Sequence, residues 1–296
     1  MSVNGKLLSV AVTAVTALGL VCVGPAVAAP TTVSGDGGNR VGVVQGDGVA
    51  SVRQGALDAP LFRQHENVKQ IALTGNRVGI LTDAGVVWVK EGGLSAGWVR
   101  ESTNVKQLAL AGDRIGVVKA GGEAYVKDGG LGAAWVLEAR NVNELELSGD
   151  RIGVVTGVGV ASVKQGGLGA AWVRQSVNVV DIDLSGTRIG LFQANGAAWV
   201  KEGALTAAWV KEADHVIQLE LSGNRIGVLQ DTGVAQVKQG ALNAPWAQQS
   251  DNTIQIALSG HRIGILKGSG AAHVKEGALD APWVLQAERV TELALS

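Results

Sequence analysis

Several residue types that mark common protein classes are almost missing from this sequence. Its 296 residues include one cysteine, Cys22, one methionine, one tyrosine and two phenylalanines. A chain with one cysteine forms no internal disulfide, so its stability must come from packing. The formal net charge of -1 provides neither a basic field for nucleic acid nor an acidic tail. We therefore expect no nucleic-acid partner.

Helical periodicity and catalytic signatures are missing as well. No stretch has apolar residues at the spacing of a helix, and the 43 glycines would interrupt one. We find no GxSxG, HExxH or P-loop motif. The histidines share no metal-binding spacing: His65, His215, His261 and His273. The sequence predicts a protein that is not an enzyme and has no catalytic residue, metal or cofactor.

The first 28 residues differ in composition from the rest of the chain. Lys6 is followed by an apolar run over residues 7–23 and then by the small residues Ala26-Val27-Ala28. This order is typical of a secretory signal peptide, whereas the run is short for a membrane anchor and lacks a charged stop behind it. We expect a signal peptide over residues 1–28, a secreted protein without a membrane span after cleavage, and one domain over residues 29–296.

The remaining residues form a repeat of 37 positions. A glycine follows eight residues after each repeated arginine, and a leucine follows seventeen residues after it. The arginine recurs seven times without insertion or deletion: Arg40, Arg77, Arg114, Arg151, Arg188, Arg225 and Arg262. One unbroken period indicates a single repeat domain.

Each repeat contains four short segments with the alternation of β-strands. In one unit these segments are residues 104–110, 114–118, 124–127 and 135–138. A glycine-containing turn joins the first two, and Gly116 in the second indicates close backbone approach or a bulge. Four strands in about 40 residues, repeated, are typical of a β-propeller blade. A linear β-solenoid is the alternative, although its coils are usually shorter and its ends need caps.

The C-terminal segment favours a closed ring. Residues 290–296 read as a complete first strand without the hairpin partner that follows it in every other unit. The segment from Gly38 to Gly42 supplies this partner at the other end of the sequence. We therefore predict an all-β, seven-bladed propeller that is closed by pairing of the C-terminal strand with the N-terminal blade.

The order of segments within one repeat is distinctive. A tryptophan-led fourth strand (residues 98–101) precedes an Asn-Val-Lys-Gln-Leu first strand (residues 104–108), a glycine turn and a hairpin ending in Trp-Val or Tyr-Val. This order, which extends over residues 29–296, resembles that of the tectonin and tachylectin propeller lectins. The resemblance implies multivalent binding of microbial or cell-surface glycans, or of cell-wall polysaccharide, in pockets within or between blades. The chain departs from these lectins by carrying Arg-Ile-Gly where they usually have a tryptophan.

Tryptophan forms the first candidate binding column, at the start of the fourth strand. An indole face stacks on the C–H face of a sugar, and repeated copies would give avidity. The favoured alternative is packing between neighbouring blades, because Leu61 replaces the tryptophan in the seventh unit. The candidate carbohydrate-binding residues in this column are Trp98, Trp135, Trp172, Trp209, Trp246 and Trp283.

A variable column on the third strand is the second candidate. Its aromatic members, Trp88, Tyr125 and Trp199, are further candidates for carbohydrate binding. Variation within a regular frame would tune ligand preference from blade to blade, but an unconstrained position at the surface or rim gives the same pattern. The other members of this column are Ser51, Ser162, Gln236 and His273.

Two charged columns have structural interpretations. The repeated arginine is expected to tie blades together through carboxylates or backbone carbonyls, rather than to bind an anionic ligand. Its expected partners are acidic residues of the innermost strands, for which a cation in the central channel is the alternative: Glu144, Glu146, Asp181, Asp183 and Glu220. A lysine column on the third strand reads as a solvated edge that discourages aggregation. It contains Lys90, Lys127, Lys164, Lys201, Lys238 and Lys275, with Arg53 in the seventh place.

Two functions remain open. The first is a secreted, multivalent glycan-binding propeller, and the second is an extracellular scaffold that binds protein partners. Equivalent pockets in successive blades would favour the first function, and an exposed apolar patch in one sector of the ring would favour the second.

Overall fold

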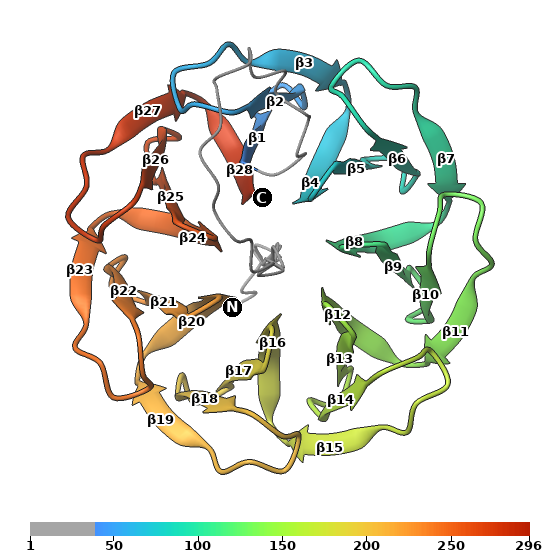
Figure 1. Ribbon diagram of the computed structural model, residues 1–296, viewed down its shortest axis with the longest axis vertical. Helices are drawn as coiled ribbons and strands as arrows, with labels where there is room; N and C mark the ends of the chain where they lie inside the picture. Colours follow the sequence, from blue (N-terminus) through green and yellow to red (C-terminus); the bar gives the residue numbers. More distant parts are fainter. Residues whose placement is uncertain (1–38) are drawn as a thin grey trace, which may run out of the picture.

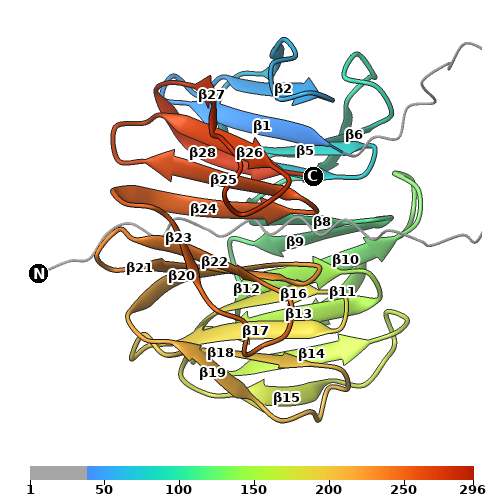
Figure 2. The same cartoon turned by 60° about the vertical axis from the view of Figure 1, so that its left-hand side comes forward.

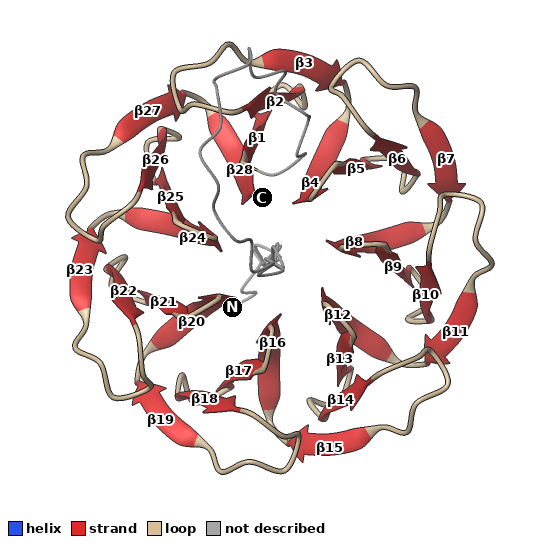
Figure 3. Cartoon of the chain, in the orientation of Figure 1, coloured by secondary structure: helices blue, strands red, loops and turns tan. Residues whose placement is uncertain are grey.

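The computed structural model describes residues 39–296, which form seven four-stranded antiparallel sheets arranged as a ring (Figure 1). All regular elements in this range are strands (Figure 3). No helix within these residues is long and apolar enough to span a membrane. The predicted signal peptide, Cys22 and the start of the predicted domain lie outside the described residues.

Seven blades follow one another around the ring, each with its first strand innermost. Blade 1 contains β28 (Val290–Leu295), β1 (Arg40–Gln45), β2 (Ala50–Gln54) and β3 (Phe62–His65). Blade 2 contains β4 (Val68–Thr74), β5 (Arg77–Thr82), β6 (Val87–Glu91) and β7 (Val99–Ser102). Blade 3 contains β8 (Val105–Ala111), β9 (Arg114–Lys119), β10 (Ala124–Asp128) and β11 (Val136–Ala139). Blade 4 contains β12 (Val142–Ser148), β13 (Arg151–Thr156), β14 (Ala161–Gln165) and β15 (Val173–Ser176).

The remaining three blades repeat the same arrangement. Blade 5 contains β16 (Val179–Ser185), β17 (Arg188–Gln193), β18 (Ala198–Glu202) and β19 (Val210–Ala213). Blade 6 contains β20 (Val216–Ser222), β21 (Arg225–Gln230), β22 (Ala235–Gln239) and β23 (Ala247–Ser250). Blade 7 contains β24 (Thr253–Ser259), β25 (Arg262–Lys267), β26 (Ala272–Glu276) and β27 (Val284–Ala287).

The ring closes within blade 1, as the sequence predicts. β28 pairs antiparallel with β1, and Val41 lies opposite Leu295. Arg40 and Ser296 then exchange two backbone hydrogen bonds of 3.0 Å each, in which each N–H donates to the other residue's carbonyl. The predicted closed propeller is confirmed, and the linear solenoid is wrong because the last strand belongs to the first blade.

The hydrophobic core lies between successive blades and depends on the glycine in each second strand. A Cβ on Gly79 would stand 2.8 Å from Leu108 Cδ2 and 3.0 Å from the nearest atom of Leu110, both on the first strand of the next blade. Glycine therefore lets these leucines pack directly on the backbone of the neighbouring sheet. The predicted close approach at Gly116 is confirmed in the same way, because Leu145 occupies the equivalent space.

One end of the blades is joined by backbone hydrogen bonds between loops, and we call it the loop-pair end. The loop between the second and third strands of each blade contacts the residue that precedes its own first strand, as when Asp83 N–H donates to Asn67 O at 2.9 Å. The same loop also accepts a hydrogen bond from the first strand of the next blade, because Val105 N–H donates to Gly85 O at 3.0 Å. The turned view shows the connections at the two ends of the stacked strands (Figure 2).

Candidate binding site between blades

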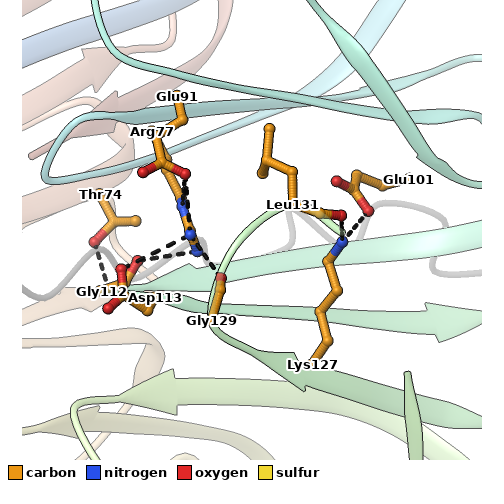
Figure 4. A network of polar contacts seen from close by, with 9 residues as sticks. All are labelled: Thr74, Arg77, Glu91, Glu101, Gly112, Asp113, Lys127, Gly129 and Leu131. Atoms are coloured by element: carbon orange, nitrogen blue, oxygen red, sulfur yellow. Dashed lines mark hydrogen bonds and ion pairs between the residues drawn. The ribbon is translucent and has the colours of Figure 1, made fainter. Parts of the chain in front are cut away.

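The lysine column is buried between blades, so its interpretation as a solvated edge is wrong. Its lysines and Arg53 are only 1–7% exposed. Each side chain turns back to donate to the carbonyl of the leucine four residues further on, as Lys127 does to Leu131 (Figure 4). Where the fourth strand of the preceding blade carries a glutamate, the lysine also forms a buried ion pair: Lys127 with Glu101, Lys164 with Glu138 and Lys238 with Glu212.

Each tryptophan of the first candidate column covers one of these buried ammonium groups. The lysine Nζ lies 4.6–5.2 Å from the indole centre in all six pairs, a distance typical of cation–π contacts. In blade 1 both partners differ together, because Arg53 replaces the lysine where Leu61 replaces the tryptophan. The indoles thus have a packing role of their own, while their role in binding glycans stays a prediction.

The arginine column joins neighbouring blades, as expected, but through other partners than the sequence suggested. Arg77 donates through Nη2 to Gly129 O of the next blade at 2.7 Å and through Nε to Glu91 of its own third strand at 3.2 Å (Figure 4). Arg40 does the same with Gly92 O, at 2.6 Å, and Gln54. The prediction that these arginines form ion pairs with the acidic residues of the innermost strands is wrong.

Those acidic residues lie on the innermost strands β12, β16 and β20, and burial favours the protonated forms of two of them, Glu146 and Asp183. Burial, followed by the charge of neighbouring Asp183, raises the pKa of Glu146 well above its ordinary value. Burial and the charge of Glu220 raise the pKa of Asp183, although backbone N–H donors oppose this shift. In the part of the chain that the structure describes, no group of three or more His, Cys, Asp or Glu side chains is arranged to hold a metal ion.

A pocket between blades 2 and 3 brings the two candidate columns together. Tyr125 of β10 and Trp135, which precedes β11, form part of its wall on blade 3. Blade 3 also contributes Lys119, at the end of β9, and β7 of blade 2 contributes the opposite wall around Ser102. The pocket has a volume of about 500 Å³, which lies within the range of small-molecule sites.

Lysine and serine fix the two blades to each other at this pocket. Lys119 Nζ donates to Ser102 Oγ and to Thr103 O, both at 2.7 Å. Partial burial lowers the pKa of Lys119, and the nearby charge of Glu123 opposes this effect. Each of these residues was absent from the predicted site, because Ser102 belongs to the preceding repeat and Lys119 lies in a column that varies between lysine, threonine and glutamine.

The same pocket recurs between blades 6 and 7. Every residue that lines it stands 148 positions, or four repeats, after its counterpart in the first pocket. Trp283 takes the place of Trp135, His273 that of Tyr125 and Lys267 that of Lys119. Its volume of about 520 Å³ is nearly the same. The variable column is therefore half-buried in pocket walls here, and its interpretation as an unconstrained surface position is wrong for these two members.

The other aromatic candidates have different neighbours. Between blades 1 and 2, His65 lies against both indoles, with ring centres 6.4 Å from Trp88 and 6.0 Å from Trp98. In blade 5, Trp199 and Trp209 are each partly buried against the same core cluster. The remaining candidates, Trp172 and Trp246, are half-buried against the cores of their own regions.

Comparisons with known proteins show similarity of fold. No family model matches the sequence, and no curated protein matches it either. The structure is similar to that of human WBSCR16, at 11% identity and a TM-score of 0.61, over 84% of this chain and 94% of that chain. It is also similar to Prp20p from Saccharomyces cerevisiae, at 11% identity and a TM-score of 0.58, over 75% and 76%. A third neighbour is PorZ of Porphyromonas gingivalis, at 14% identity and a TM-score of 0.60, over 83% of this chain and 36% of that one.

Proposed function

We propose that this protein is a non-catalytic, exported propeller that binds glycans in the pockets between its blades. The observation that carries the proposal is the recurrence of one pocket, residue for residue, four repeats apart. A ligand with repeating units needs repeated small sites, because each weak contact then adds to the avidity of the others. A single protein partner does not require equivalent pockets at separate blade interfaces.

The pocket walls have the chemistry that a sugar ring requires. Trp135 and Tyr125 offer aromatic surface for the C–H face of a pyranose, and Ser102 and Thr103 line the same pocket with hydroxyl groups. Export follows from residues 1–28, which we propose to be a signal peptide that is cleaved before Ala29.

A protein-interaction scaffold is the second candidate, and one structural feature favours it. Four exposed apolar side chains lie next to the backbone hydrogen bonds of the loop-pair end in blades 4 to 7: Val158, Val177, Ile217 and Ile254. Val158 and Ile217 are 74% and 51% exposed. The structural neighbours are consistent with a scaffold, since Prp20p is described with binding to Gsp1p and histones, and PorZ as a bacterial surface component of a secretion system.

A glycan array with microbial wall polysaccharides, probed with residues 29–296, tests the two candidates. We expect binding that one free sugar competes and that Tyr125→Ala together with His273→Ala weakens. These positions avoid the indoles, whose removal would also uncover buried lysines. The matched control replaces Ile217 and Ile254 by serine, which should leave glycan binding unchanged.

The opposite pattern would favour the scaffold. In that case a folded protein leaves the array blank, and retention of a partner from an envelope extract is lost in the Ile217→Ser, Ile254→Ser variant but kept in the pocket variant. Either outcome assigns the function to one of the two surfaces.

A further inference from the structure

The two equivalent pockets differ in charge, although their frames match. The pocket between blades 2 and 3 (pocket 2–3) has Arg100 and Thr103 where the pocket between blades 6 and 7 (pocket 6–7) has Gln248 and Asp251. Arg100 therefore places a second cation near the lysine of the first pocket, whereas Asp251 places a carboxylate near the lysine of the second.

In pocket 6–7 the lysine is satisfied within the protein. Lys267 Nζ lies 3.3 Å from Asp251 Oδ1 and donates to Ser250 Oγ at 2.5 Å. Gln248 and Gln249 are uncharged, so the pocket presents the internal pair of Lys267 with Asp251 and no second lysine or arginine.

In pocket 2–3 the positive charge has no such internal partner. Lys119 Nζ donates to two neutral oxygens, Ser102 Oγ and Thr103 O. Among the described residues, no carboxylate forms an ion pair with Lys119 or with Arg100. The carboxylate of Glu101 is buried and forms an ion pair with Lys127, away from solvent. Glu123 acts on Lys119 from the loop that follows β9 without forming an ion pair. The pocket therefore presents two cationic side chains beside an aromatic wall.

We propose that pocket 2–3 binds glycans that carry a carboxylate, whereas pocket 6–7 binds neutral sugars. This inference rests on the proposed glycan-binding function and adds the class of sugar. The sugar carboxylate would accept hydrogen bonds from the Lys119 ammonium and the exposed Arg100 guanidinium, which suits such a group by its planar fork. The ring of the same sugar unit would lie against Trp135 and Tyr125. A charged hydrogen bond at a partly exposed site gives a preference of about tenfold.

Because the two pockets are equivalent, two double substitutions can exchange their charges. Arg100→Gln with Thr103→Asp gives pocket 2–3 the charges of pocket 6–7, and Gln248→Arg with Asp251→Thr does the reverse. Arg100, Thr103 and Asp251 are exposed, so these changes should leave folding intact. Far-ultraviolet circular dichroism and the melting temperature serve as folding controls for both variants.

The probes are uronic-acid oligosaccharides, their methyl esters, and neutral and sulfated oligosaccharides, with binding measured on an array and by calorimetry. The methyl ester keeps the ring and removes the charge. We expect the wild-type protein to prefer the acid over its ester by about tenfold, the Arg100→Gln, Thr103→Asp variant to lose this preference, and the reverse variant to gain acid binding.

Each other outcome overturns a defined part of the inference. Equal binding of acid and ester, or an acid preference that the exchange leaves unchanged, contradicts the assignment of pocket 2–3 but leaves glycan binding in place. Equal binding of sulfated sugars that is sensitive to the exchange would replace the carboxylate by anions in general. Absence of binding to every oligosaccharide would overturn the proposed function together with the inference.

Discussion

At the scale of single residues, the repeat buries a basic side chain in every blade: a lysine ammonium group in six blades and the guanidinium of Arg53 in blade 1. The cost of burying it is offset in three ways: a leucine carbonyl, an indole face and, in three blades, a glutamate. The third contribution varies with the blade. Lys90 faces Gln64 in place of a glutamate, and burial, followed by the charge of Arg40, lowers its pKa to about 8.

Gln64→Glu should therefore stabilise the protein at neutral pH. A lysine whose pKa falls on folding costs stability below the folded value of about 8, and this cost fades as the pH rises towards the unfolded value of 10.5. A carboxylate at position 64 raises the folded pKa, so we expect a gain of about 1 kcal/mol at pH 7 that disappears near pH 10.5. Urea unfolding at the two pH values measures it.

The reverse change in the next blade is the matched control. Glu101→Gln removes the carboxylate that pairs with Lys127 and should lower the free energy of unfolding by about 1–3 kcal/mol at pH 7. An unchanged or lower stability of the Gln64→Glu variant at pH 7 would contradict this account of the column.

Predictions for single residues are least reliable where a charged side chain is taken to be exposed. A lysine followed by an acidic or amide residue reads as surface, yet its stem and head group pack between two sheets. The signal that could have corrected this interpretation is internal to the sequence: Arg53 and Leu61 depart from the lysine and tryptophan columns in the same blade. Such paired departures indicate that the two columns are in contact.

At the scale of strands, glutamine side chains join four of the seven innermost strands to the innermost strand of the next blade. Gln107 Nε2 donates to Leu145 O at 3.1 Å while its Oε1 accepts from Leu145 N at 2.9 Å. The amide thus takes the place of a missing peptide group and satisfies both polar atoms of the facing residue. Gln70, Gln218 and Gln255 make the same pair of bonds.

Glu292→Gln should extend this pattern to the strand that closes the ring. Glu292 accepts from Ile71 N at 3.1 Å, and burial raises its pKa well above the ordinary 4.5. A carboxyl whose pKa rises on folding costs little stability below pH 4.5, and the cost grows as the pH rises from 4.5 to the folded pKa, above which it is constant. The amide should therefore add about 1–3 kcal/mol to the free energy of unfolding at pH 7 and little at pH 4.

The converse substitution, Gln255→Glu, should lose stability at pH 7 and recover it at pH 4. Chemical unfolding of both variants at the two pH values tests the pair. A gain for Glu292→Gln that is equal at pH 4 and pH 7 would show that titration of this carboxyl is not the cause.

Strand positions were predictable to within one residue, as β8 to β11 show, because alternation and turns recur in the same register. The pocket was predictable only in part. Its tryptophan and tyrosine stood out as columns, whereas Ser102 and Lys119 lie on strands of different blades whose contact no single repeat displays. Such contacts between neighbouring blades follow only from the three-dimensional stacking of the sheets.

At the scale of the whole molecule, all seven blades depend on the pairing of β28 with β1. β28 completes blade 1 and also packs against the first strands of blades 2 and 7. Removing it would leave blade 1 with three strands and uncover apolar side chains on two neighbours.

Deletion of residues 290–296 should therefore destabilise the entire ring. We expect one cooperative transition with a melting temperature lowered by more than about 10 °C, because several buried side chains are lost at once. Differential scanning calorimetry provides the measurement, and removal of Ser296 alone, which costs two backbone hydrogen bonds, is the control with a smaller effect. An unchanged melting temperature in the longer truncation would contradict closure by β28 as the source of stability.

The position of the closing pair has a mechanical consequence. Asn39 and Ser296 lie together at the same end of the antiparallel ladder, where every other blade has a covalent turn. A force that pulls these two residues apart therefore acts across the strands and breaks the ladder one pair at a time, beginning with the bonds between Arg40 and Ser296. Under tension the ring would unzip at this seam at low force, even though the same bonds hold it closed at rest.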